Sequence, residues 1–280
     1  MRTFTKVWLG IGLLAIGFGL VIVLLATFTG GFYHKGEATF SFSDSYENVD
    51  DIDINISYGK VEILEGDTFS IEARNLWKEE LTSYTEGGTW YISDENNKMV
   101  RFFGNRVSLG RLISWNDDYT PIITITLPRD FVANEFYLDV DAGEVKADTI
   151  RAKNGNFNVD AGRLVVENLS IKETSQYNVG AGEMILKNLT AQDISLDCGV
   201  GRVEITGTLK GKNSVSCGIG KVELDLMGEE SDFSYQINSG IGNVSINNND
   251  YHNVAKHIQN DTDNFLELDC GIGNITVDFN

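Results

Sequence analysis

The sequence predicts an all-β protein: a right-handed parallel β-helix, or β-solenoid, with an antiparallel N-terminal cap and one transmembrane helix before it. Three observations predict this fold. A glycine-centred motif recurs at a nearly constant interval, as in solenoid repeats. Only 2 of the 280 residues are Pro, which favours long sheet ladders because Pro removes a ladder donor. A long uncharged stretch lies near the start of the chain.

The uncharged stretch covers residues 7–28, VWLGIGLLAIGFGLVIVLLATF. A helix of this length spans roughly 33 Å, enough to cross the hydrocarbon core of a bilayer. Arg2 and Lys6 precede it, so the positive-inside rule places the N-terminus in the cytoplasm and the bulk of the chain outside. The alternative is a cleaved signal peptide, but Ala26-Thr27-Phe28 ends in a bulky residue, unlike an A-x-A-like cleavage site. We therefore expect an uncleaved single-pass anchor in the cell membrane.

The chain divides into five predicted parts. They are a cytoplasmic tail (1–6), the transmembrane helix (7–29), a linker (30–43), a first solenoid strand pair with the antiparallel cap (44–139), and the repetitive solenoid (140–280).

The repeat has the form [V/C]-[D/G]-[A/V/I]-G-x-[V/I/L]. From Gly143 onward its anchoring glycines step by 19, 20, 19, 19, 22 and 31 residues, and a period near 20 fits one coil of a β-solenoid. Apolar residues alternate before the glycine (Leu196, Cys198, Val200) and again after it in the other phase (Val203, Ile205). An inward row continues through such a change only if the chain bends, so we interpret each glycine as a corner where the missing Cβ permits a sharp turn. The eight corner glycines are Gly59, Gly143, Gly162, Gly182, Gly201, Gly220, Gly242 and Gly273.

Stacked coils, each with three short strands, align equivalent residues in rows. Eight coils at about 4.8 Å each predict a rod of roughly 38 Å. The inward row before the corner is Val140, Val159, Val179, Cys198, Cys217, Ser239 and Cys270. Its cysteines read better as small core residues than as a redox pair between Cys198 and Cys217, because in-register parallel neighbours rarely have disulfide geometry.

Two outward rows are polar. One contains Asn55, Asp139, Asn158, Asn178, Asp197, Ser216, Asn238 and Asp269. The residues after the corner are Glu144, Arg163, Glu183, Arg202 and Lys221, and the change of sign from coil to coil predicts pairs of opposite charge between neighbouring strands.

The stretch between Gly59 and Gly143 is longer than a coil. Strand-like segments at 69–73, 89–92 and 122–128 predict antiparallel strands that cover the N-terminal end of the solenoid, since an open end invites aggregation. The insertion at 247–264 is the candidate cover for the other end.

One basic and aromatic segment, 101–115, stands out in an acidic chain. Its candidate interaction residues are Arg101, Phe102, Phe103, Arg106, Arg111 and Trp115. It is either a loop that binds an acidic protein, glycan or headgroup, or a hydrophobic cover with Arg stems packed along it.

The chemistry of the sequence points away from catalysis. A net charge of −19 argues against nucleic-acid binding, and 3 His and 3 Cys leave little for metal sites or His-based triads. The nearest approach to an acid pair is Asp139, Asp141 and Asp160, which have no basic partner evident in the sequence. Calcium-binding nonapeptides and EF-hand loops are absent, and the G-x-G copies lead into strand-like residues instead of a helix. We expect no catalytic residue, cofactor or metal.

The repeated motif resembles the bacterial toastrack family of candidate adhesins, domains of unknown function in cell-envelope proteins. Further marks are the early copy Ile56-Ser57-Tyr58-Gly59-Lys60-Val61 and the segment Ile123-Thr124-Ile125-Thr126-Leu127-Pro128; the resemblance covers about residues 44–280. It implies a β-solenoid on the cell envelope with no established catalytic residues. Some relatives sit beside envelope-stress regulatory systems.

The expected function is thus a non-catalytic, adhesin-like binding or scaffolding module, anchored in the membrane, whose partner is an envelope protein or glycan. The first alternative is an accessory regulator that senses envelope stress through a membrane partner, because a six-residue tail is too short for an output domain. A carbohydrate-active enzyme is the remote alternative.

Overall fold

The computed structural model describes residues 39–77, 81–94, 100–102, 105–107 and 120–280. The predicted anchor at 7–29 lies outside these residues. The described chain is all-β, as predicted: one 20-stranded sheet winds into a stack of coils, and a separate hairpin pairs β7 (Val100–Phe102) with β8 (Asn105–Val107). Within the described ranges, no helix has the length and apolar character needed to cross a membrane.

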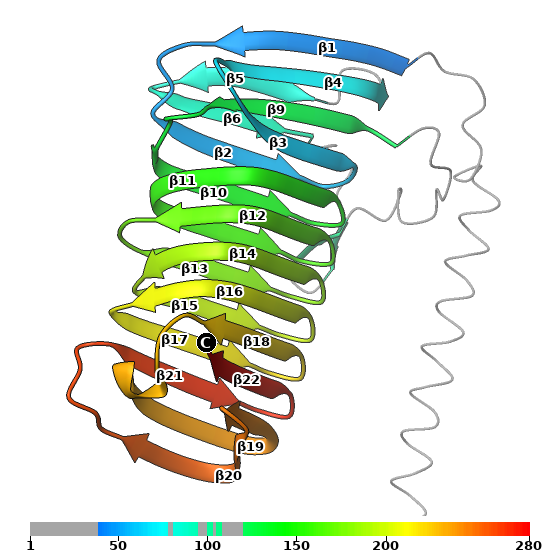
Figure 1. Cartoon of the computed structure of the whole chain (residues 1–280). Helices are drawn as coiled ribbons and strands as arrows, with labels where there is room; N and C mark the ends of the chain where they lie inside the picture. The colour runs from blue at the N-terminus through cyan, green and yellow to red at the C-terminus, as the bar shows by residue number, and fades with distance from the viewer. Residues whose placement is uncertain (1–38, 78–80, 95–99, 103–104, 108–119) are drawn as a thin grey trace, which may run out of the picture.

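Each coil, called a rung below, contains one strand before the corner glycine and one strand after it, two in place of the three short strands that the sequence predicted. Neighbouring rungs pair in parallel and in register, so that Val140 lies opposite Val159 and Val159 opposite Val179. Figure 1 shows the rungs stacked along the rod. Rungs 1 to 6 are formed, in order, by β2 (Asp51–Ile56) with β3 (Lys60–Gly66), β10 (Ala133–Val140) with the first part of β11 (Glu144–Val159), the rest of β11 with β12 (Arg163–Ile171), β13 (Ser175–Val179) with β14 (Glu183–Gln192), β15 (Ile194–Cys198) with β16 (Arg202–Lys210), and β17 (Lys212–Cys217) with β18 (Lys221–Leu226).

The last two rungs do not stack in the order of the sequence. Rung 7 is formed by β21 (Phe265–Cys270) and β22 (Asn274–Phe279), which pair with rung 6 on one side. On its other side rung 7 pairs with β19 (Ser234–Ile246), which is rung 8. After rung 6 the chain therefore skips the next position in the stack and forms rung 8 at the outer end. It then returns to form rung 7 between rungs 6 and 8. A short 3-10 turn (Glu230–Asp232) lies in the connection.

The C-terminal end of the rod is covered, as we predicted from the insertion at 247–264. Strand β20 (Asn249–Ile258) runs antiparallel along the outside of β19. The extra chain at 247–264 is thus long enough both to cover the sheet edge and to carry the chain back to rung 7.

The N-terminal cap is only partly the antiparallel layer that was predicted. β6 (Thr89–Ser93) and β9 (Ile122–Pro128) pair in parallel with β2 and β3, so they form a further rung without a glycine corner. The antiparallel strands lie outside it: β4 (Phe69–Trp77) on β9, β1 (Thr39–Tyr46) on β4, and β5 (Thr82–Glu86) on β6. The Asp94 carboxylate takes part of the missing corner's role, since it accepts the Ser57 and Tyr58 N–H groups at 2.6 and 3.0 Å.

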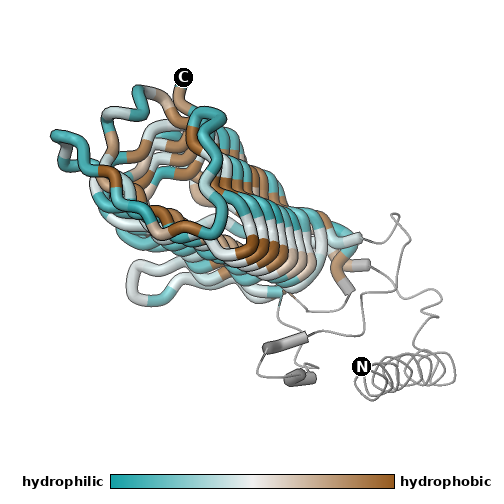
Figure 2. Tube along the Cα trace, turned by 90° about the horizontal axis from the view of Figure 1, so that it is seen from below, coloured by the Kyte–Doolittle hydropathy of each residue, from teal (hydrophilic) through white to brown (hydrophobic). Residues whose placement is uncertain are grey.

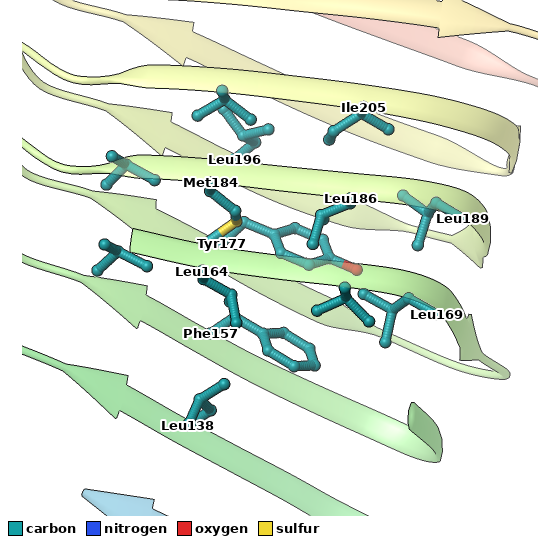
Figure 3. Packing of buried hydrophobic residues seen from close by; sticks show 14 of the residues in the cluster. Leu138, Phe157, Leu164, Leu169, Tyr177, Met184, Leu186, Leu189, Leu196 and Ile205 are labelled. Atoms are coloured by element: carbon teal, nitrogen blue, oxygen red, sulfur yellow. The ribbon is translucent and has the colours of Figure 1, made fainter. Parts of the chain in front are cut away.

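The core fills the space inside the rungs. Alternate residues point inward, and Phe136, Phe157 and Tyr177 stack at ring-centroid distances of 5.8 and 5.4 Å in rungs 2 to 4. Figure 3 shows Phe157 and Tyr177 among Leu side chains of the neighbouring strands. Figure 2, a view along the rod, shows positions of like hydropathy aligned from rung to rung. The repeated pattern therefore builds one continuous core.

The corner glycines form a column, as predicted, but for a different reason. Only Gly59 among them has a positive φ, 119°. At Gly182 an added Cβ would lie 2.6 Å from Val159 Cγ1, and at Gly201 2.6 Å from Val179 Cγ1; in both cases the carbonyl oxygen of the neighbouring corner glycine is closer still. The missing Cβ thus allows neighbouring rungs to approach each other closely. Among the corner glycines, only Gly59 needs the backbone freedom of glycine.

Candidate interaction surface

The tip of each corner is the residue between the two glycines of the G-x-G copies. In rungs 5 to 8 this residue is a branched aliphatic: Val200, Ile219, Ile272 and Ile241. Their side chains are 58–85% exposed, although nearly all other branched aliphatics of the sheet are buried. We call these four residues the ridge. Because they occupy the same position in consecutive rungs, the ridge is one continuous apolar line at the C-terminal end of the rod.

The ridge corrects the prediction that Val200 continues the inward row of Leu196 and Cys198. Leu196 and Cys198 are buried, but Val200 is 61% exposed. Strand β15 ends at Cys198 and the corner begins at Gly199, so the alternation of a strand does not extend to Val200.

The other half of the corner edge is a groove. In rungs 2 to 4 the tip residues are Ala142, Ala161 and Ala181, and the groove runs beside them over the corner glycines. Its other wall is the charged row that follows the corner, from Lys60 to Glu183. The same edge therefore changes from a shallow groove to a raised ridge halfway along the rod, because the tip residue changes from Ala to Val or Ile.

The charged row forms the predicted pairs between rungs 2 and 4. Arg163 donates to Glu183 at 2.6 Å and to Glu144 at 3.4 Å. A hydrogen bond from Lys146 and the charge of Arg163 lower the pKa of Glu144. Farther along, the predicted alternation is wrong: Arg202 and Lys221 follow one another, and both bind Glu223, at 3.0 and 2.6 Å.

The other outward row follows the predicted register across the rungs, with Asp269 before Asn238. Amides join members of neighbouring rungs, as in Asn178 to Asn158 at 2.7 Å and Asn238 to Asp269 at 2.7 Å. These bonds are interactions within the sheet, so they hold the register of the rungs.

The cysteines lie in consecutive rungs, because Cys270 pairs with Cys217 and precedes Ser239 in the stack. All three are buried free thiols. The interaction between the neighbouring Cys198 and Cys217 thiols lowers the pKa of Cys198 and raises that of Cys217, and burial raises the pKa of Cys270. The raised pKa values disfavour the reactive thiolate at Cys217 and Cys270, and the burial of all three side chains agrees with a packing role.

The residues predicted from segment 101–115 are not brought into a described site. Arg101 and Phe102 belong to β7 and Arg106 to β8, and the structure places only their backbone. Phe103, Arg111 and Trp115 lie outside the described residues. Neither interpretation of this segment is therefore tested.

The acids considered for catalysis remain on the surface of rungs 2 and 3. Asp139 accepts a hydrogen bond from the Tyr137 hydroxyl at 3.2 Å. Asp141 and Asp160 begin the corners of their rungs, where the Ala161 N–H donates to the Asp141 carbonyl at 2.7 Å. None of the three lines the groove. In the part of the chain that the structure describes, no group of three or more His, Cys, Asp or Glu side chains could hold a metal ion.

A comparison of the sequence with family models decides the family. A model described as Toastrack DUF4097 matches residues 49–278, the whole stack from rung 1 onward. The chain belongs to the Toastrack DUF4097 family. The name of this toastrack family carries no assigned function. A search of curated proteins gives no significant match.

Three solved structures are similar to this toastrack domain. A candidate cell adhesion protein from Clostridium sporogenes is 17% identical, with 87% of this chain and 100% of that chain covered and a TM-score of 0.39. A candidate adhesin from Bacteroides fragilis is 12% identical, with 86% and 97% covered and a TM-score of 0.43. A candidate lipid-binding protein from Parabacteroides distasonis is 15% identical, with 86% and 97% covered and a TM-score of 0.46.

The ridge was not predicted from the sequence, although the sequence contains a signal for it. Glycine on both sides of Val200, Ile219, Ile241 and Ile272 marks them as corner tips, and the equivalent residue in the three preceding copies is Ala. A large apolar residue at a position that the same repeat elsewhere fills with Ala is unlike a core position, where volume is conserved.

Proposed function

We propose that this toastrack protein is a membrane-anchored, extracytoplasmic, non-catalytic module that acts by adhesin-like binding or scaffolding on the bacterial cell envelope. The ridge is the observation that carries the proposal. Folding leaves Val200, Ile219, Ile272 and Ile241 in water at the end of the rod, and a contiguous exposed apolar patch marks an interaction surface in a soluble domain. Family membership supports an envelope role, and the uncharged residues 7–28 support the anchor.

Anchoring and orientation are tested together on intact cells. A membrane-impermeant protease should remove the solenoid from whole cells that express the full chain, and a tag fused before Met1 should be cleaved only after lysis. A solenoid that stays protected on intact cells, or a chain recovered from the soluble fraction, would contradict the proposal.

Binding is tested by crosslinking on the same cells. Wild-type chain should capture a partner that a chain with Ile219→Asp and Ile272→Asp does not capture, whereas Met227→Asp should behave as wild type. Met227 is a suitable control because it is 61% exposed, like Val200, and lies outside the ridge. Equal capture by wild type and ridge variant would refute a role for the ridge.

The identity of the captured partner and a separate glycan-depolymerisation assay distinguish the alternatives. Capture of a membrane-embedded signalling protein would favour the accessory regulator of envelope stress. Depolymerisation of an envelope glycan, lost on Asp139→Asn, Asp141→Asn and Asp160→Asn, would establish the enzyme instead.

A further inference from the structure

The corner edge of the rod is complementary to itself. Its proximal half is the groove, beside Ala142, Ala161 and Ala181 in rungs 2 to 4 and beside Tyr58, the tip residue of rung 1. Its distal half, in rungs 5 to 8, is the ridge. The rungs of both halves have the same spacing, about 4.8 Å. A surface that contacts all four ridge residues at once must repeat at the rung spacing, and the edge of a second copy of the chain repeats at this same spacing.

We propose that the ridge of one copy docks into the groove of a second copy that runs in the opposite direction. A two-fold axis perpendicular to the rods, between rungs 4 and 5, brings the ridge of each copy onto the groove of the other. Because this contact is isologous, each pair of facing residues occurs twice, once on each side of the axis. Rung 3 then faces rung 6, so Ala161 of one copy lies against Ile219 of the second copy. This inference names the partner of the binding surface in the proposed function and rests on that proposal.

Charges close to the axis agree with this arrangement. The charged row lies on the same side of both edges, so Glu183 in rung 4 of one copy faces Arg202 in rung 5 of the other, and the reverse. Arg163 and Lys221 also face each other, and all four side chains have partners in their own chain: Arg163 pairs with Glu183 at 2.6 Å, and both Lys221 and Arg202 pair with Glu223, at 2.6 and 3.0 Å. The pair nearest the axis is thus of opposite charge, and the positions of the ridge and the groove, more than the charges, set the direction of the contact.

The size of the contact predicts its strength. An edge of eight rungs is roughly 38 Å long and, as the rim of two packed strand layers, about 10 Å wide. The two copies together would bury roughly 800 Å², which is below the size of stable interfaces. A single pair should be weak, and many pairs between two surfaces should bind strongly through avidity. Two anchored rods that meet in opposite directions extend from two facing membranes, so the contact suits adhesion between like cells.

The proposal is tested with full-length chain reconstituted in phosphatidylcholine vesicles. Wild-type vesicles should aggregate, measured by turbidity, and aggregation should increase with salt, which screens the repulsion between two acidic rods. Joint Ile219→Asp, Ile241→Asp and Ile272→Asp substitution should slow aggregation at least tenfold, and Met227→Asp should not change it. Circular dichroism checks that each variant is folded. Aggregation of the folded triple variant at the wild-type rate would overturn the proposal.

Direction is tested by oxidation of single-cysteine variants in detergent solution. An equal mixture of Ala161→Cys and Ile219→Cys chains should give a mixed disulfide dimer, since the native cysteines are buried. Dimers of Ile219→Cys alone, without the mixed product, would show a parallel contact and overturn the proposal. This measurement needs no membrane, so it separates failure of the anchor from failure of self-association. A mixed dimer with a soluble, unanchored chain would refute only the proposed anchoring.

Discussion

The corner glycines carry a graded prediction, because the neighbouring rung crowds them to different degrees. A Cβ on Gly201 would lie 2.6 Å from Val179 Cγ1 and closer still to the Gly182 carbonyl oxygen. Hydrogen bonds hold both rungs here: the Arg202 N–H donates to Gly182 at 3.0 Å, and the Lys221 N–H donates to Gly201 at 3.0 Å. Neither backbone can withdraw without breaking the ladder. Gly201→Ala should therefore lower the free energy of unfolding by about 3 kcal/mol or more.

Gly143 provides the matched comparison within the same column. Its added Cβ would meet Ile56 Cγ2 at 3.0 Å and the Gly59 carbonyl oxygen at 3.1 Å, a contact that a few tenths of an ångström would relieve. We expect Gly143→Ala to cost about 1 kcal/mol. Melting followed by far-ultraviolet circular dichroism measures both, and for a chain of this size the expected decreases in Tm are about 6–12 °C and about 2–4 °C. If Gly201→Ala is no more destabilising than Gly143→Ala, close approach is not the reason for the glycine column.

Three further predictions concern single groups. Tyr177→Phe should raise stability by about 1 kcal/mol, because the buried Tyr177 hydroxyl has no hydrogen-bond partner among the described residues; Tyr235→Phe is the control and should lower it, since its hydroxyl donates to the Glu230 carbonyl at 2.8 Å. Asp94→Ala should cost about 2–4 kcal/mol in urea titrations by leaving two corner N–H groups without their acceptor, and Asp94→Asn should cost less. Stability should fall as the pH decreases from about 5 to 3, because hydrogen bonds from Lys221 and Arg202 lower the pKa of Glu223 in the folded state below its unfolded value of about 4.3. The stabilisation by the Glu223 carboxylate is complete above its unfolded pKa and is lost as the pH falls through its folded pKa. Glu223→Gln should therefore make the decrease of stability at acid pH shallower, and an unchanged slope would contradict this assignment.

Much of the rod followed from the repeat alone. The glycine column, the inward rows, the register of the outward rows and the covered C-terminal end were all predicted, because stacking forces equivalent residues into line. The order of rungs 7 and 8 could not be predicted. Cys270 and Ser239 have the same neighbours in the motif, and either order buries the same residues.

Two other features escaped prediction for local reasons. The rung formed by β6 and β9 has no glycine corner, because the Asp94 side chain satisfies Ser57 and Tyr58 instead of a stacked backbone. The ridge was hidden because Val200 continues the apolar alternation of Leu196 and Cys198 in the sequence. The glycines on both sides of Val200 and the end of the strand at Cys198 show that Val200 points away from the core.

The order of the ridge residues, with Ile272 between Ile219 and Ile241, requires that rung 7 lies between rungs 6 and 8. A short bifunctional thiol reagent that spans one rung, but not two, measures this order in the folded full-length chain. Ile219→Cys with Ile272→Cys should crosslink within one chain, because Cys217 pairs directly with Cys270. Ile219→Cys with Ile241→Cys should not crosslink, because these tips lie two rungs apart, at about 9.6 Å. The opposite result would place the rungs in sequence order and contradict the architecture from which the ridge and its proposed partner were inferred.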